Sequence, residues 1–150
     1  ARKAGRHDLL PAEPQACANV ERWMDWQATE FNNAWRYVFP ALGRKNPDFN
    51  DPERIAAGIK EWNHCITILE NQLQRTGAFA AGETFTLADV VLGLSVNRWK
   101  MTPFDKPDVP AIEAWFERLN QRPAFLRHGN NGMIKSILDP ILSKDILINY

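Results

Sequence analysis

The most regular alternation of hydrophobic and polar positions lies between residues 52 and 76. Its apolar side chains recur at intervals of four and three residues: Ile55, Ile59, Trp62, Ile66, Leu69 and Leu73. This spacing places them on one face of an α-helix. Asp51 and Pro52 are residue types that commonly cap and begin a helix, and Gly77 is typical of the position just past a helix end. The pattern predicts a long amphipathic helix.

A second helix is predicted to start after a local capping pattern. Thr86 stands three residues before Asp89, so the two side chains can each accept a hydrogen bond from the other residue's backbone N–H, as in a capping box. Phe85 and Val90 occupy the two positions of a hydrophobic staple. These residues predict a helix that begins at Leu87.

The body of this second helix, residues 87–96, leaves no polar face for about two turns. A helix that is apolar all round is expected to be buried all round, and about fifteen residues are too few to span a bilayer. We therefore expect the central helix of a soluble helical domain, ending near Met101. Gly93 in its interior predicts a neighbour packed close to the backbone.

Weaker patterns predict the other elements. Apolar spacing from Pro14 to about Val38 predicts a helix that Pro40 ends or kinks, and a further helix begins at Pro110. A short turn around Phe125 follows it. In residues 130–150, helical spacing interrupted by Pro140 predicts one or two short helices, from Met133, Ile134, Ile137, Leu138, Ile141 and Leu142. No strand pattern of useful length appears, so the fold class expected is all-α, a bundle of about five to seven helices.

The amino-acid composition and charge of the chain argue against several classes of function. The chain has 150 residues, 45% of them hydrophobic, and its 18 basic residues balance 18 acidic ones. Zero net charge argues against a nucleic-acid or anionic-membrane surface as the main role. Cys17 and Cys65 have neither CxxC nor zinc-ligand spacing, which indicates reduced thiols. With no signal peptide and no run of eighteen apolar residues, we expect a cytoplasmic protein with no membrane partner.

Candidate chemistry is sparse. There is no GxSxG, P-loop or GxGxxG motif, and His64 and Cys65 are helix neighbours that point in different directions, so no metal site is expected. Acidic residues at helical spacing among Arg and Lys are expected on solvated faces. Among the six tryptophans, Trp35 and Trp99 each lie near a helix end beside an arginine. Both could line an apolar cleft suited to an electrophilic small molecule.

Four sequence motifs, which occur in the same order as in the family, resemble the C-terminal domain of cytosolic glutathione transferases. Among the classes of this family, the resemblance is nearest to the bacterial theta-like or beta-like ones. The resemblance covers roughly residues 1–128. Its motifs are Gly82-Glu83-Thr84-Phe85-Thr86-Leu87-Ala88-Asp89-Val90, Trp26 to Asn32, Asn97-Arg98-Trp99, and Pro110 to Arg118 with Arg122-Pro123-Ala124-Phe125. It implies a helical domain over 14–129, a tail over 130–150, and residues 1–13 as the end and linker of a preceding thioredoxin-like domain.

The resemblance also implies how the transferase activity is divided between this chain and the preceding thioredoxin-like domain. The family residue that activates the glutathione thiol lies in the thioredoxin-like domain, so no catalytic residue is expected in this chain, which should be inactive alone. The chain would wall the pocket of an apolar electrophile, with glutathione as co-substrate and no bound cofactor. Its first two long helices would form the interface of a homodimer.

Residue by residue, the resemblance assigns contacts with glutathione to Asn32 and Asn33, and a contact with the partner subunit's site to Asp25. Trp99 corresponds to a tryptophan of the electrophile pocket, and Trp35 would face the same pocket. The box of Thr86 and Asp89 would serve folding. Two alternatives stay open: a non-catalytic helical domain that binds a protein partner, and a bundle without a ligand in which Trp35 and Trp99 are buried apart.

Overall fold

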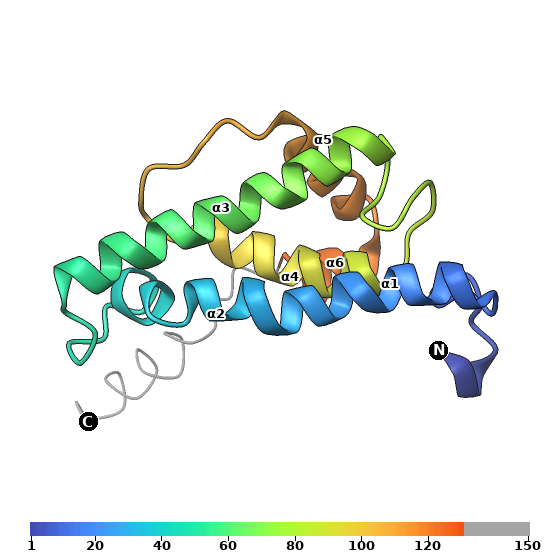
Figure 1. Cartoon of the computed structure of the whole chain (residues 1–150), viewed down its shortest axis with the longest axis horizontal. Helices are drawn as coiled ribbons and strands as arrows, with labels where there is room; N and C mark the ends of the chain where they lie inside the picture. The colour runs from blue at the N-terminus through green and yellow to red at the C-terminus, as the bar shows by residue number, and fades with distance from the viewer. Residues whose placement is uncertain (131–150) are drawn as a thin grey trace, which may run out of the picture.

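Helices account for all the regular secondary structure of the computed structural model, which describes residues 1–130. Figure 1 shows α4 running between α3 and the line formed by α1 and α2. Apart from one isolated bridge between Phe79 and Gly82, residues 1–130 contain no β-structure, which confirms the all-α prediction. The helices are α1 (Pro14–Trp26), α2 (Asn32–Trp35), α3 (Pro52–Thr76), α4 (Leu87–Met101), α5 (Pro110–Asn120) and α6 (Pro123–His128).

Helix α3 has the predicted ends. The Asp51 carboxylate accepts from the backbone N–H of Glu53 at 2.9 Å and of Arg54 at 3.2 Å, and Gly77 ends the helix with φ of 72°. The φ of Gly77 lies in the left-handed region that glycine adopts without strain. The predicted stripe is buried from Trp62 onwards, while its first two isoleucines are only half-buried.

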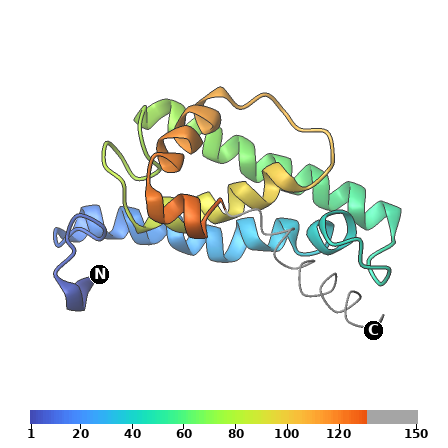
Figure 2. The same cartoon turned by 180° about the vertical axis from the view of Figure 1, so that it is seen from behind.

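Helix α4 begins with the predicted capping box of Thr86 and Asp89. The Thr86 N–H donates to Asp89 Oδ2 at 2.8 Å. Gly93 confirms the expected close approach, since a Cβ there would lie 2.6 Å from Phe125 Cε2. Figure 2 shows α6, which carries Phe125, beside the first half of α4. The expectation of burial all round is wrong at Val90, which is 37% exposed and lines a hollow between the N-terminal segment, α4 and α6.

The first long helix changes its winding before Val38, although its helical backbone runs without a gap from Pro14 to Trp35. α1 ends at Trp26, a wide π-helical turn, η2 (Gln27–Phe31), follows, and α2 ends at Trp35. A second π-helical turn, η3 (Phe39–Gly43), contains Pro40, in agreement with the predicted break. A π-turn inserts an extra residue and rotates the side chains that follow it, and apolar spacing alone does not reveal this insertion.

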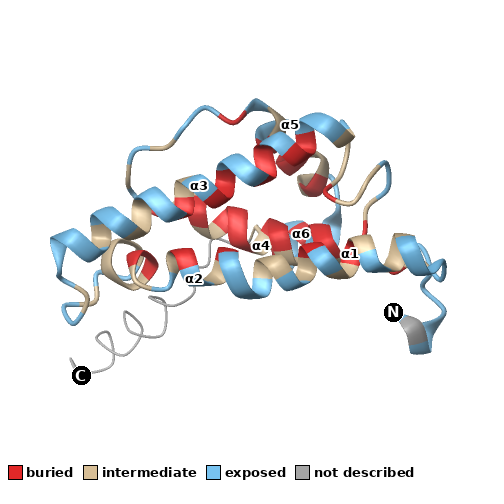
Figure 3. Ribbon diagram, in the orientation of Figure 1, coloured by how far each residue is buried: buried red, intermediate tan, exposed pale blue. Residues whose placement is uncertain are grey.

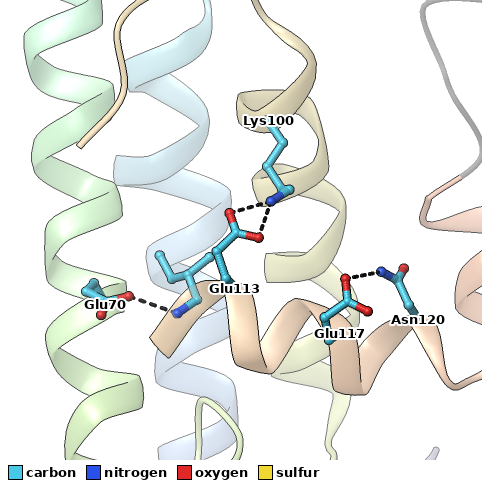
Figure 4. Close-up of polar contacts among 6 residues, drawn as sticks. Glu70, Lys100, Glu113, Glu117 and Asn120 are labelled. Carbon is cyan, nitrogen blue, oxygen red and sulfur yellow. Dashed lines mark hydrogen bonds and ion pairs between the residues drawn. The ribbon is translucent and has the colours of Figure 1, made fainter. Parts of the chain in front are cut away.

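Helix α5 is held from two sides (Figure 4). Glu70 of α3 accepts hydrogen bonds from the N–H groups of Ala111 at 3.0 Å and Ile112 at 2.8 Å, in the first turn of α5. Lys100 of α4 forms an ion pair with Glu113. The expectation that acidic residues lie on solvated faces is therefore wrong for Glu70, which is 5% exposed. A carboxylate is stable there because it faces the positive end of the helix dipole.

Burial follows the inward faces of the helices (Figure 3). Three tryptophans, Trp62, Trp99 and Trp115, are fully buried, whereas Trp26 and Trp35 are only partly buried. Residues 2–4 form a 3-10 turn, which Gly5 follows with φ of 62°. The helices predicted beyond Asn130 lie outside the described residues.

Candidate functional site

The π-turn η2 brings polar side chains against α4. Gln27, its first residue, donates from Nε2 to Ser95 Oγ of α4 at 2.7 Å and to Asn32 Oδ1 at 3.0 Å. Ser95 is fully buried, so its hydroxyl needs this partner. Neither Gln27 nor Ser95 was predicted from the sequence, because a π-turn and a contact 68 residues away leave no local signal.

Two residues predicted for the site, Asn32 and Trp35, lie together one turn apart. Trp35 Nε1 donates to Asn32 Oδ1 at 3.0 Å, so this amide oxygen accepts from both the indole and Gln27. The bond fixes the indole ring of a tryptophan that remains partly exposed. Asn32 thus orients an aromatic surface that a ligand can reach.

Arg98 of α4 completes this cluster. Its guanidinium carbon lies 4.2 Å from the centre of the Trp35 ring and 5.3 Å from that of Phe39. The rings of Trp35 and Phe39 meet edge to face, with centroids 5.8 Å apart. Burial lowers the pKa of Arg98, and the nearby charge of Arg44 lowers it further. An arginine still stays protonated at neutral pH, so the cluster carries a positive charge against two aromatic rings.

Trp99 lies against a different element. It is 1% exposed, and its Nε1 donates to Asn63 Oδ1 of α3 at 2.9 Å. Arg98 and Trp99 are consecutive helical residues, so their side chains diverge by about 100°. The structure therefore brings Trp35 to Arg98, and it places Trp99 between α4 and α3.

The two other predicted contact residues are on the surface. Asn33 and Asp25 are both exposed, on α2 and α1 respectively. Neither belongs to the hydrogen-bonded group of Gln27, Asn32 and Trp35. Their assigned contacts, with glutathione and with a partner subunit, remain predictions.

The buried thiol of Cys65 is not suited to nucleophilic attack. Cys65 is 2% exposed, and burial raises its pKa to about 11, so it is a neutral thiol at pH 7. Within residues 1–130, no group of three or more His, Cys, Asp or Glu side chains could hold a metal ion. No helix in the same part of the chain is long and apolar enough to cross a membrane.

Two hollows outside the cluster are lined at least in part by apolar side chains. One, of about 230 Å³, lies between α1 and α3 and is lined by Trp23, Trp26, Ile68, Arg22 and Arg75. The other, of about 380 Å³, lies where the N-terminal segment meets α4 and α6, and its lining includes Leu9, Phe85, Val90, Leu94 and Phe125. Ile68 and Val90 are two of the large apolar residues that remain exposed.

Comparisons with known proteins converge on one family. The family described as "Glutathione S-transferase, C-terminal domain" matches residues 33–123. The chain is 27% identical to glutathione S-transferase GstB of Escherichia coli (strain K12) over 120 residues, which cover 80% of this chain and 57% of that protein. It is also 30% identical over 108 residues to cytoplasmic methionine–tRNA ligase of Bos taurus, covering 69% of this chain and 11% of the ligase.

Solved structures agree in fold. The theta class glutathione S-transferase of the citrus canker pathogen Xanthomonas axonopodis pv. citri, in its apo form, matches with a TM-score of 0.75 at 30% identity, over 81% of this chain and 63% of that chain. Its glutathione-bound form matches with a TM-score of 0.74. The chain spans 57% of the length of the E. coli protein and 63% of the Xanthomonas chain.

Proposed function

Because the chain belongs to the glutathione S-transferase C-terminal domain family, we propose that it is the helical half of an enzyme that conjugates glutathione to small electrophiles. The observation that carries the proposal is the cluster of Asn32, Trp35 and Arg98, in which a partly exposed indole is fixed by a hydrogen bond and covered by a cation. A rigid aromatic wall with a polar rim suits a small, apolar second substrate.

In this proposal the chain positions the electrophile and the complete enzyme supplies the thiolate. The sulfur forms a bond to the electrophilic carbon, and the leaving group departs with the electron pair of the bond that breaks. Asn32 and Asn33 are the proposed contacts with glutathione, and Trp35 would wall the pocket. Trp99 would support the wall from behind, since it ties the last turn of α4 to α3.

A preceding thioredoxin-like domain is the proposed source of the thiol-activating residue, with residues 1–13 as its end and linker. The hollow lined by Leu9, Val90 and Phe125 supports this arrangement, because the segment that would lead from that domain already lines it. We propose that the domain packs there and covers the exposed side of α4. A cytoplasmic location is proposed with it.

A homodimer through α1 and α3 is also proposed, with Asp25 directed at the partner's site. The hollow of Trp23, Trp26 and Ile68 supports this interface, because it leaves aromatic and aliphatic surface exposed between the two helices. Large aromatic residues and arginines are the residue types enriched where protein interfaces form.

Ile68→Lys should weaken this dimer by at least about ten-fold, because it places a third cation beside Arg22 and Arg75 in an apolar contact. Sedimentation equilibrium would measure the dissociation constant. Thr67→Lys, on the neighbouring exposed position, is the matched control and should dimerise normally. A parent chain that is monomeric at every concentration, or equal dissociation of the two variants, would contradict the interface.

A titration with glutathione and with S-(2,4-dinitrophenyl)glutathione tests the proposed function. We expect calorimetry to detect the conjugate, whose aromatic group can stack on Trp35, and Trp35→Leu to weaken its binding by about ten-fold. Phe79→Leu removes a partly buried aromatic ring outside the cluster and the proposed dimer interface, and it should leave the affinity unchanged. If a folded sample bound neither ligand, the chain would not hold a preformed half of the pocket.

The same titration addresses the second candidate function, a non-catalytic helical domain that binds a protein partner. The similarity to a segment of methionine–tRNA ligase favours this second function. A related sequence occurs there within a protein that is not named a transferase. A folded chain that binds neither glutathione ligand but dimerises or captures another protein through α1 and α3 would support this alternative.

A further inference from the structure

Arg98 has no counter-ion among the residues that the structure describes, 1–130. Its side chain is partly buried, and its buried Nε has no hydrogen-bond partner within the same residues. Across residues 1–130 no carboxylate is paired with it, and the charge that acts on it is that of another arginine, Arg44. A charged group withdrawn from water without a partner is costly, so a bound anion would relieve an existing penalty.

Arg44 brings a second guanidinium to the same place. Its guanidinium carbon lies 5.1 Å from the centre of the Phe39 ring, while that of Arg98 lies 5.3 Å from the same centre. Arg44 follows η3 and is exposed, so it can turn toward a ligand without disturbing the core. Two like charges at one buried ring, with no described carboxylate between them, create a locally positive potential.

The aromatic neighbours indicate what kind of anion fits. The Arg98 guanidinium lies over the rings of Trp35 and Phe39, and its fixed fork of N–H donors matches the geometry of a carboxylate. The partly exposed Trp35 ring offers a flat apolar surface beside that fork. We propose that Arg98 and Arg44 bind the carboxylate of a planar aromatic acid, whose ring lies against Trp35. This proposal rests on the proposed function, and it assigns a carboxylate group to the electrophilic substrate.

Calorimetric titration with benzoate and with benzamide tests this proposal on the full chain. Benzamide has the same size and shape but no charge. We expect benzoate to bind at least ten-fold more tightly than benzamide, and Arg98→Gln to remove that preference, because charge-assisted hydrogen bonds are lost. Arg98→Lys should recover only part of it, since a lysine lacks the planar fork. Arg44→Gln should reduce benzoate affinity several-fold, whereas Arg36→Gln, an exposed arginine outside the cluster, should not.

Thermal melting establishes whether each variant is folded. If Arg98→Gln is unstable, Arg44→Gln provides the test instead, because Arg44 is exposed and its replacement does not disturb the core. Equal affinities for benzoate and benzamide, or the same loss in Arg36→Gln, would overturn the proposal. So would an Arg98→Gln effect on the glutathione conjugate alone, which would assign the arginines to the carboxylates of glutathione. Arginine-dependent benzoate binding without conjugate binding would support this site while contradicting the transferase function.

Discussion

Replacing Asp89 with alanine is expected to lower the free energy of unfolding by about 3–5 kcal/mol. The carboxylate is fully buried and accepts four hydrogen bonds from three residues. Alanine would leave the donors of Ala80, Thr86 and Trp115 unpaired in the core, each at a cost of about 1–3 kcal/mol.

The size of this effect depends on contacts beyond the helix cap. Asp89 Oδ2 accepts from the Thr86 N–H, as the capping box requires, but Oδ1 accepts from the Ala80 N–H and from Trp115 Nε1, both at 2.9 Å. One side chain therefore joins the loop before α4, the start of α4 and the middle of α5. A cap alone contributes about 0.5–2 kcal/mol, so a larger loss measures the other two bonds.

Urea unfolding measures the loss, with the slope of the transition checked for two-state behaviour. Asp89→Asn keeps an acceptor at Oδ1 and should lose less than alanine. Trp115→Phe should cost less in the Asp89→Ala background than in the parent, because its partner is already gone. Asp25→Ala, at an exposed aspartate, should stay within about 0.5 kcal/mol. A loss below about 2 kcal/mol for Asp89→Ala would confine this residue to the local cap.

The parts of the fold that the sequence predicted correctly are those set by near neighbours in the chain. The ends of α3 follow from Asp51 and Gly77, and the start of α4 follows from the spacing of Thr86 and Asp89. Caps act over about three residues, so a single sequence contains all their partners. Gly93 was informative for a similar reason, since an interior helical glycine is costly unless a neighbour needs the space.

The predictions that were wrong concern features that neighbouring residues in the sequence do not determine. The η2 turn has no local signature, although it precedes the helix on which Trp35 meets Arg98 of α4. Val90 belongs to an apolar run, but it lines an open hollow beside Leu9 and Phe125 and is 37% exposed. For the candidate site, the sequence indicated the individual residues Asn32 and Trp35. It did not indicate that Arg98, and not Trp99, would meet Trp35.

Glu70 is the strongest example of a residue whose role the sequence concealed. The residue before α5, Val109, provides no side-chain cap, and the Glu70 carboxylate takes that role from α3, 41 and 42 residues away. Glu70→Ala should lower the free energy of unfolding by about 2–4 kcal/mol, because two backbone N–H groups lose their acceptor and the helix dipole loses a charge. Glu70→Gln retains one acceptor oxygen, so it should lose about half as much.

Amide hydrogen exchange distinguishes this capping role from a general loss of packing. If Glu70 caps α5, the Ala111 and Ile112 amides should exchange faster in Glu70→Ala than the amides of α1, because the first turn of α5 would open locally. Glu61→Ala, at an exposed glutamate of α3, should change neither exchange nor stability. Uniformly faster exchange across all helices would instead mean that Glu70 contributes only to global stability. Preserved protection at the two amides would show that another group accepts their hydrogen bonds.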